Sequence, residues 1–142
     1  MKSSQSIGDV AARFGIETHV LRHWEDVGLL RPARDGADRR RYGDDDLVRI
    51  AVILRSKAAG MSLEQIAVLL DDEAPSRHEV LQGHLDDLER RMREMERSRE
   101  MTEHALRCRS HDITQCTRFR GFVDDVLAGT TRWSADGWAA TH

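Results

Sequence analysis

Residues 6–43 read SIGDVAARFGIETHVLRHWEDVGLLRPARDGADRRRYG, and this segment defines the architecture of the amino-terminal half of the chain. Ser6 is a favoured helix N-cap and Gly15 readily adopts the left-handed conformation that ends a helix, which predicts a first helix between them. Thr18 is placed to cap a second helix, in which apolar and polar residues occupy opposite faces. The polar face carries His19, Arg22, His23 and Asp26. Two helices joined by a tight glycine-containing turn form a helix-turn-helix, whose polar face is either a binding surface or simply solvated.

The residues that follow predict a hairpin wing and two more helices. Residues 31–43 contain too much Gly, Asp and Arg for a helix, and Arg39–Tyr42 is suited to one strand of a hairpin. Asp44 is placed to cap a third helix, with further acidic residues in its first turn. A capping box at residues 62–65 opens a fourth helix. Residues 1–72 are therefore expected to form a winged helix-turn-helix domain.

Residues 76–107 predict one long helix that needs a partner. No Pro interrupts them, and a continuous helix over this range would be about 48 Å long. Steps of four and three along the chain mark a mostly apolar heptad seam. Its positions are Leu81, Leu85, Leu88, Met92, Met95, Arg99, Thr102 and Leu106. Because a single helix this polar cannot bury its own seam, a second copy of the chain is the expected partner, in a coiled-coil dimer. The alternative is folding back within the chain, although no downstream segment is long enough to cover the seam.

Composition and charge favour a folded protein that docks at one place on a nucleic acid. The chain has 142 residues, of which 39% are hydrophobic and 33% charged. This is too apolar for a disordered chain, and no apolar run approaches the roughly 20 residues that cross a bilayer. The polar start carries no secretory signal, and two cysteines are too few for a disulfide scaffold, so a cytoplasmic protein without membrane contact is expected. Although the net charge is −3, residues 31–43 contain five arginines against two acids, a local basic patch.

Four sequence pieces occur in the order and with the separations of a known family. They are SIGDVAARFGI, LRHWEDVGLLRPAR, RRRYGDDDL and AAGMSLEQIAVLL. The segment from residue 6 to residue 71 therefore resembles the DNA-binding domain of the MerR family of bacterial transcription regulators. The resemblance implies a mainly α fold and a homodimer whose long helices pair antiparallel. It also implies that the dimer binds a near-palindromic promoter operator and distorts the DNA so that RNA polymerase can read both promoter elements.

The resemblance also implies which residues contact DNA. The helix that enters the major groove supplies Thr18, His19, Arg22 and His23, and the wing supplies Arg39, Arg40, Arg41 and Tyr42. Arg40 matches the family's wing arginine, and the planar fork of arginine can bind guanine edges or phosphate oxygens. The chain departs from the family pattern at His23-Trp24, where two aromatics are common, and at Asp38-Arg39, where Gly-Tyr is common. An alternative for Arg22 is a structural role, in which it pairs with Glu25, with Asp26 or with a helix end.

Residues 108–128 are expected to form an effector loop followed by a short helix. Cys108 and Cys116 are separated by seven residues, and two cysteines at this spacing are similar to the loop of the copper-sensing branch of the family. Thiolates suit a soft ion such as Cu(I), and His111, three residues after Cys108, has a ligand-like offset. These residues predict a metal site for Cu(I) or Zn²⁺. In the branches of the family that sense divalent ions, a further cysteine stands at the start of the long helix; residues 73–78 of this chain contain none, so the resemblance argues against a thiolate-rich mercury or zinc site.

Two other interpretations of the cysteines stay open. Cys108 and Cys116 can switch between dithiol and disulfide, or they can be small buried residues that anchor the loop. The remaining histidines of the long helix are expected to be solvated; they are His78, His84 and His104. Residues 129–142 form a tail with two tryptophans, Trp133 and Trp138, which either dock on the body or lie loose.

These observations predict a sequence-specific transcription regulator that responds to a metal or redox signal. The alternative is a constitutive or architectural DNA-binding protein of the same fold, with structural cysteines. An enzyme is not expected, because the sequence has no phosphate-binding loop, no nucleophile elbow and no activating motif beside either cysteine.

Overall fold

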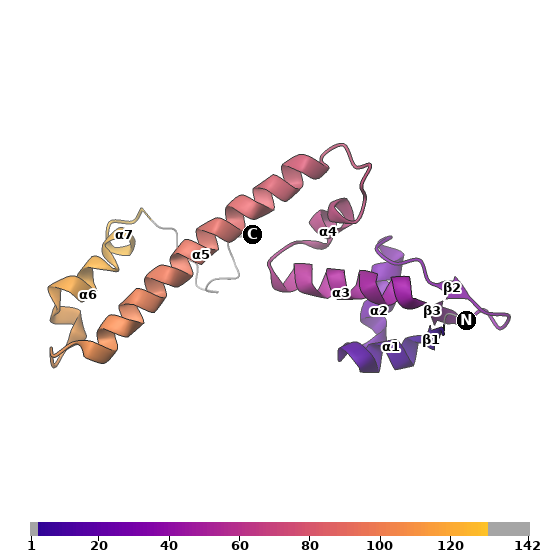
Figure 1. Cartoon of the computed structure of the whole chain (residues 1–142), viewed down its shortest axis with the longest axis horizontal. Helices are drawn as coiled ribbons and strands as arrows, with labels where there is room; N and C mark the ends of the chain where they lie inside the picture. Colours follow the sequence, from indigo (N-terminus) through magenta and orange to yellow (C-terminus); the bar gives the residue numbers. More distant parts are fainter. Residues whose placement is uncertain (1–2, 131–142) are drawn as a thin grey trace. The chain divides into compact units, whose positions relative to one another are not determined.

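The computed structural model describes residues 3–130, which are mainly helical, as predicted. They divide into two compact units, with the boundary after Leu81. The elements of the first unit are β1 (Gln5–Ser6), α1 (Ile7–Phe14), α2 (Thr18–Asp26), β2 (Ala33–Arg34), β3 (Arg40–Tyr42), α3 (Asp44–Ala58) and α4 (Leu63–Leu69) (Figure 1). The long helix α5 (Arg77–Arg107) begins in this unit and continues into the second. The second unit also contains a 3-10 turn (Ile113–Gln115), α6 (Thr117–Gly121) and α7 (Asp124–Leu127).

The helix ends of the first unit follow local capping chemistry. The Ser6 side chain accepts a hydrogen bond from the Asp9 amide at 3.2 Å, and Gly15 ends α1 with φ 67°. The capping box that opens α4 is also confirmed, because the side chain and amide of Ser62 bond reciprocally to those of Gln65 at 3.1 and 2.9 Å. Two predicted caps were wrong by one residue. Thr18 is the first residue of α2 rather than its cap, and α3 is capped at Gly43.

The wing is a hairpin within a three-stranded antiparallel sheet of order β1-β3-β2. Arg34 pairs with Arg40 across the hairpin, and Ser6 pairs with Arg41 on the other side of β3. The predicted wing strand is therefore confirmed at the centre of the sheet. Strand β1 was not expected from the sequence, because two residues are too few for a periodic pattern. It ties the residues before α1 to the wing.

One apolar core joins α1, α2, the sheet, α3 and α4. Its largest fully buried side chains are Trp24, Tyr42, Leu21, Leu29, Leu30, Ile50, Ile53, Ile66 and Val10. Trp24 fixes α2 from its inner face, which leaves the opposite, polar face of that helix toward solvent. The core thus positions both the second helix and the wing strand.

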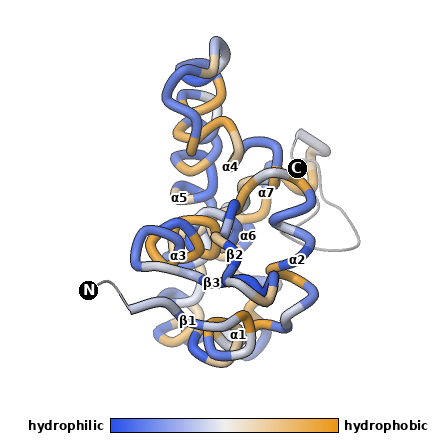
Figure 2. The backbone as a smooth tube through the Cα atoms, turned by 90° about the vertical axis from the view of Figure 1, so that its right-hand side faces the viewer, coloured by the Kyte–Doolittle hydropathy of each residue, from blue (hydrophilic) through white to orange (hydrophobic). Residues whose placement is uncertain are grey.

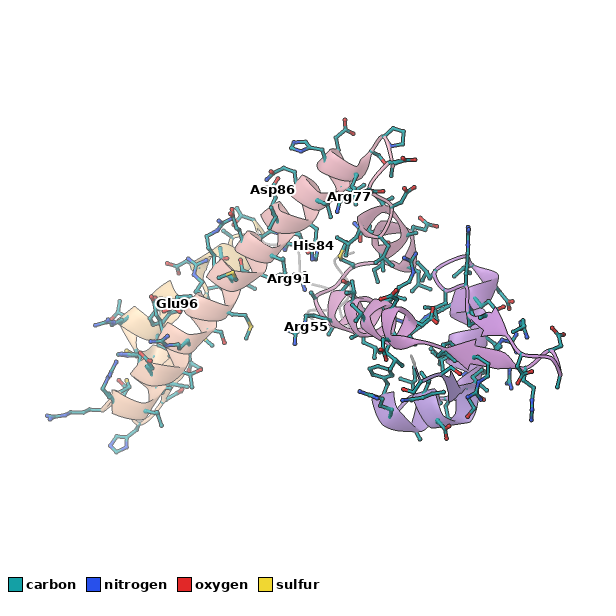
Figure 3. All side chains as sticks on the ribbon, turned by 45° about the vertical axis from the view of Figure 1, so that its right-hand side comes forward. Arg55, Arg77, His84, Asp86, Arg91 and Glu96 are labelled. Atoms are coloured by element: carbon teal, nitrogen blue, oxygen red, sulfur yellow. The ribbon has the colours of Figure 1, made fainter. Side chains whose placement is uncertain are left out.

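Helix α5 starts one residue later than predicted and has no buried side chain along its length. Its first residue, Arg77, donates from Nε and Nη2 to the carbonyl of Leu69 at 3.3 Å, which ties the helix start to α4 (Figure 3). Beyond that point Leu81 still packs against the core, but four apolar side chains farther along are more than half exposed. The exposed fractions are 53% for Leu85, 70% for Met92, 62% for Met95 and 84% for Leu106. Hydrophobic and hydrophilic residues alternate along α5 (Figure 2).

The segment after α5 folds as a turn and two short helices. The predicted single short helix is therefore divided in two, with the break at Phe122 and Val123. Asp125 of α7 accepts an ion-pair contact from Arg97 of α5 at 3.0 Å, which holds the short helices beside the long one. The tail tryptophans Trp133 and Trp138 lie outside the described residues. A search of the described helices finds none with the length and apolarity that crossing a membrane requires.

Candidate DNA-binding surface and metal centre

A basic hollow lies between α2 and the wing. It is lined by Ser6, Ile7, Arg22, Arg34, Asp38, Arg39, Arg40 and Arg41. Five of these residues are arginines, contributed by α2, both hairpin strands and the turn that joins them. The fold thus gathers four of the five arginines of residues 31–43 on one surface, together with Arg22 of α2. A surface of this kind attracts a polyanion.

Glu25 on α2 holds the wing by two ion pairs. Its carboxylate contacts Nε of Arg40 at 2.5 Å and Nη2 of Arg34 at 3.0 Å. The hydrogen bond from Arg40 is the main cause that lowers the pKa of Glu25, and the same bond raises the pKa of Arg40. The side chains of Glu25 and Arg40 are only 22% and 23% exposed. Part of the positive charge of Arg40 is therefore neutralised within the protein.

Asp35 organises the turn at the tip of the wing. Its Oδ1 accepts hydrogen bonds from the amides of Ala37 at 2.9 Å and Arg39 at 3.0 Å. The bond from the Arg39 amide is the main cause that lowers the pKa of Asp35. Asp38 takes the left-handed conformation at φ 60°, which aspartate tolerates better than most residues. The turn leaves the side chain of Arg39 78% exposed.

The other predicted DNA contacts on α2 and β3 differ in how far their side chains are free to bind DNA. His19, Arg22 and His23 are exposed on α2, and Arg22 bonds to the hydroxyl of Thr18 at 3.4 Å rather than to an acid. Arg41 is partly occupied, because its Nη2 donates to the carbonyl of Ser4 at 2.7 Å.

Tyr42 does not belong to the surface. Its side chain is fully buried in the core, and its hydroxyl has no hydrogen-bond partner in the structure. Burial also raises the pKa of Tyr42. The prediction that this side chain contacts DNA was wrong, because successive strand residues point to opposite faces and Tyr42 points inward. The sequence prediction also left out Arg34, which lines the hollow and pairs with Glu25.

In the second unit, His104, Cys108 and Cys116 converge. One ligand atom from each lies within 4.8 Å of the others, and all three residues are half-buried. His104 is in the last turn of α5, Cys108 follows the end of that helix, and Cys116 is the N-cap of α6. Nε2 of His104 is 3.3 Å from Sγ of Cys116. Two sulfurs and an imidazole nitrogen are a suitable donor set for a soft or borderline metal ion.

The histidine of this group is not the predicted one. His111 is exposed and lies outside the group, because it precedes a turn that Asp112 closes by accepting from the amide of Thr114 at 3.0 Å. The prediction that His104 is solvated was wrong. Its ring packs against Phe122, with 6.3 Å between ring centroids. The sequence did contain a signal, since His104 and Cys108 are four residues apart, the spacing that places two side chains on one helix face.

Both cysteines are free thiols, and their environments favour a reactive form at Cys108. Hydrogen bonds from Ser110 are the main cause that lowers the pKa of Cys108, and Cys116 contributes in the same direction. A lowered pKa increases the fraction of thiolate, which is both the metal ligand and the nucleophile in disulfide formation. The structure thus brings Cys108 and Cys116 together, as predicted, in an arrangement that suits either chemistry.

The ion pairs of Glu25 lead to a pH-dependent prediction. Because its pKa is lowered in the folded state, the carboxylate stabilises the fold above the ordinary glutamate pKa, and this contribution is lost as the pH falls through the folded value. Glu25→Gln should lower the free energy of unfolding by about 0.5–1 kcal/mol at neutral pH. The difference from wild type should shrink between about pH 5 and pH 3. Urea unfolding across this range measures it, with the exposed Glu89→Gln as control; a difference independent of pH would contradict the assignment.

Comparison with known proteins identifies the family. The chain matches the family model described as MerR HTH family regulatory protein over residues 5–73, and the one described as MerR, DNA binding, over residues 47–104. The HTH-type transcriptional activator TipA of Streptomyces coelicolor is 36% identical over 124 residues. That alignment covers 85% of this chain but 49% of TipA, so the chain spans about half the length of this relative.

A second relative is covered over most of its length. Heavy metal-dependent transcription regulator 1 of Rhizobium meliloti is 30% identical over 110 residues, which are 72% of this chain and 75% of that protein. The crystal structure of HiNmlR, a MerR family regulator lacking the sensor domain and bound to promoter DNA, shares the fold with a TM-score of 0.63 at 24% identity. It covers 86% of this chain and 98% of that one. The chain therefore belongs to the MerR family of DNA-binding HTH transcription regulators.

Proposed function

We propose that the protein acts as a homodimer that binds a near-palindromic promoter operator, distorts the DNA for RNA polymerase, and responds to a metal ion bound at its carboxyl-terminal His/Cys group. The observation that carries this proposal is the presence in one chain of an arginine-lined surface beside α2 and of three converging metal-ligand side chains around the end of α5. The first supplies a means of binding DNA and the second a means of sensing.

The DNA contacts are divided between α2 and the wing. The polar face of α2 enters the major groove with Thr18, His19, Arg22 and His23, and the wing contacts the neighbouring backbone with Arg39, Arg40 and Arg41. Arg39 has the most exposed of the wing side chains engaged in ion pairs, and its guanidinium can make two parallel hydrogen bonds to a phosphate. Arg40 acts mainly by holding the wing to Glu25, which leaves less of its charge for DNA.

The dimer forms through the seam of α5. Leu85, Met92 and Met95 recur at heptad spacing and are more than half exposed in the single chain. The seam is flanked by charged residues such as Asp86 and Glu96, both exposed (Figure 3). Pairing with a second α5 buries these apolar side chains and leaves the charged positions in solvent.

The metal response rests on the thiolates of Cys108 and Cys116. A similar protein is described as heavy metal-dependent, and the donor set of this chain fits an ion such as Cu(I) or Zn²⁺. A second candidate signal is redox, because the two sulfurs lie within 4.8 Å and the pKa of Cys108 is lowered. In that case the pair loses two electrons and two protons to an oxidant such as a peroxide and forms a disulfide.

Disrupting the seam should produce monomers. The double variant Met92→Glu, Met95→Glu places two negative charges at positions that a partner helix would bury, so we expect the molar mass in solution to fall to that of one chain. Light scattering after size-exclusion chromatography measures this mass. The control is Arg93→Glu, an exposed position of the same helix with the same total change in charge. A dimer that survives in the double variant, or a wild-type monomer, would contradict the proposed interface.

Removing Arg39 should lower the salt dependence of DNA binding. Loss of one phosphate contact decreases the slope of log K against log salt by about 0.9 and weakens binding about equally across sequences. Fluorescence anisotropy with a duplex selected from a random-sequence library by the wild-type protein measures both quantities. Arg118→Ala on α6 changes the same charge elsewhere and should leave the slope unchanged. A slope unchanged in Arg39→Ala would remove this residue from the contacts.

Removing both thiols should abolish the effector response. We expect protein purified without oxygen to bind a metal ion that the double variant Cys108→Ser, Cys116→Ser does not bind. Transcription in vitro from a promoter carrying the selected operator should respond to that ion only with the wild-type protein. Reversible loss of two thiols on oxidation, with altered DNA binding and no bound metal, would instead establish the redox signal. If the wild-type protein shows neither a metal response nor a redox response, it is a constitutive regulator.

A further inference from the structure

The imidazole of His104 lies beside the two cysteine sulfurs, at a distance that suits a shared metal ion. Its Nε2 is 3.3 Å from Sγ of Cys116, and Sγ of Cys108 completes a group whose ligand atoms all lie within 4.8 Å of one another. A tetrahedral ion with bonds of about 2.3 Å to sulfur and about 2.0 Å to nitrogen holds those two ligand atoms about 3.5 Å apart. The observed separation therefore fits neighbouring positions around one ion with little movement of either side chain.

Different elements of the second unit fix the three side chains. His104 belongs to the regular helix α5, which places it independently of the loop, and its ring packs against Phe122 with 6.3 Å between ring centroids. Cys108 leaves the same helix one turn later, and Cys116 begins α6. A metal ion bound by all three side chains would therefore connect the end of α5 to the start of α6. If His104 and Cys116 only shared a hydrogen bond, Cys108 would have no reason to lie within 4.8 Å of both of them.

We infer that His104 is the third protein ligand of the metal centre, and that the centre is a site for a divalent, zinc-class ion rather than for Cu(I) held between two thiolates alone. This inference rests on the proposed metal response and specifies its ion. Two thiolates satisfy Cu(I), whereas imidazole is a ligand that zinc-class ions share with thiolates. The chain has no third cysteine, so the nitrogen is what distinguishes this donor set from a two-sulfur site. Three protein ligands leave a fourth position for water or another small ligand.

The test compares two histidine variants of the full chain, reduced and kept free of oxygen. His104→Ala removes the inferred ligand, and His111→Ala removes the exposed histidine that lies outside the group. Co²⁺ serves as the spectroscopic probe, because its visible absorption reports the number and type of ligands, and Zn²⁺ and Cu(I) affinities follow from competition with chelators. Circular dichroism and urea unfolding show whether each variant is folded, and His104→Gln provides a second variant of similar size.

We expect His104→Ala and His104→Gln to weaken Zn²⁺ and Co²⁺ binding by at least about 100-fold, since even residues that only support a ligand cost 10- to 100-fold. The visible Co²⁺ spectrum should change in both, while Cu(I) affinity should change by only a few-fold. His111→Ala should match wild type throughout. Unchanged Zn²⁺ affinity and Co²⁺ spectrum in the His104 variants would overturn the inference but leave the metal response intact. An equal loss of Cu(I) binding would overturn the choice of ion. Failure of the wild-type chain to bind any of the three ions would overturn the proposed metal response as well.

Discussion

Glu25 lies between Arg34 and Arg40, which belong to opposite strands of the wing hairpin, and this arrangement determines where the remaining positive charge is exposed. Its neighbour Trp24 is buried in the core, so consecutive residues of α2 anchor that helix and hold the wing against it. The ion pairs of Glu25 neutralise part of the charge at the base of the hairpin, whereas Arg39 at its tip, although paired with Asp35 at 3.3 Å, keeps its side chain 78% exposed. The proposed DNA-binding surface therefore depends on one carboxylate, which holds the wing without itself being a proposed DNA contact.

The parts of the fold that the sequence predicted correctly are those with local causes. The Ser6 cap, the Gly15 terminus and the Ser62 capping box depend on interactions within a few residues, so a reader of the sequence can find them. The apolar seam of α5 was predictable from its spacing for the same reason. The ion pairs of Glu25 span up to 15 residues along the chain, and β1 is a strand only because β3 lies beside it. Such features arise from tertiary packing, which no local pattern encodes.

The candidate sites show the same limit at the level of single side chains. Tyr42 was grouped with the wing arginines because it is adjacent to them in sequence, but a strand turns alternate residues to opposite faces, and the core takes the aromatic one. His111 was favoured over His104 because it follows Cys108 at a ligand-like offset of three residues. In an irregular loop, an offset of three residues does not fix where a side chain points. On a helix, residues four apart lie on the same face, as His104 and Cys108 do at the end of α5. Helical spacing was the stronger evidence and pointed to the histidine that the fold brings to the sulfurs.

The seam of α5 is weakest at the end that carries the His/Cys group. Toward its start the heptad positions are Leu and Met, but Arg99 and Thr102 interrupt the seam before Leu106. Both polar residues are satisfied within their own helix, since Arg99 pairs with Glu103 at 3.0 Å and Thr102 donates to the carbonyl of Ser98 at 2.8 Å. They gain little from a partner helix, so pairing contributes least free energy there. In the proposed dimer, a ligand that ties the end of α5 to α6 would therefore act where pairing contributes least, while Arg77 holds the other end of the same helix to α4. This uneven seam is a physical reason for the proposed effector site to lie at the end of α5, because a small binding free energy can shift the conformation of that end.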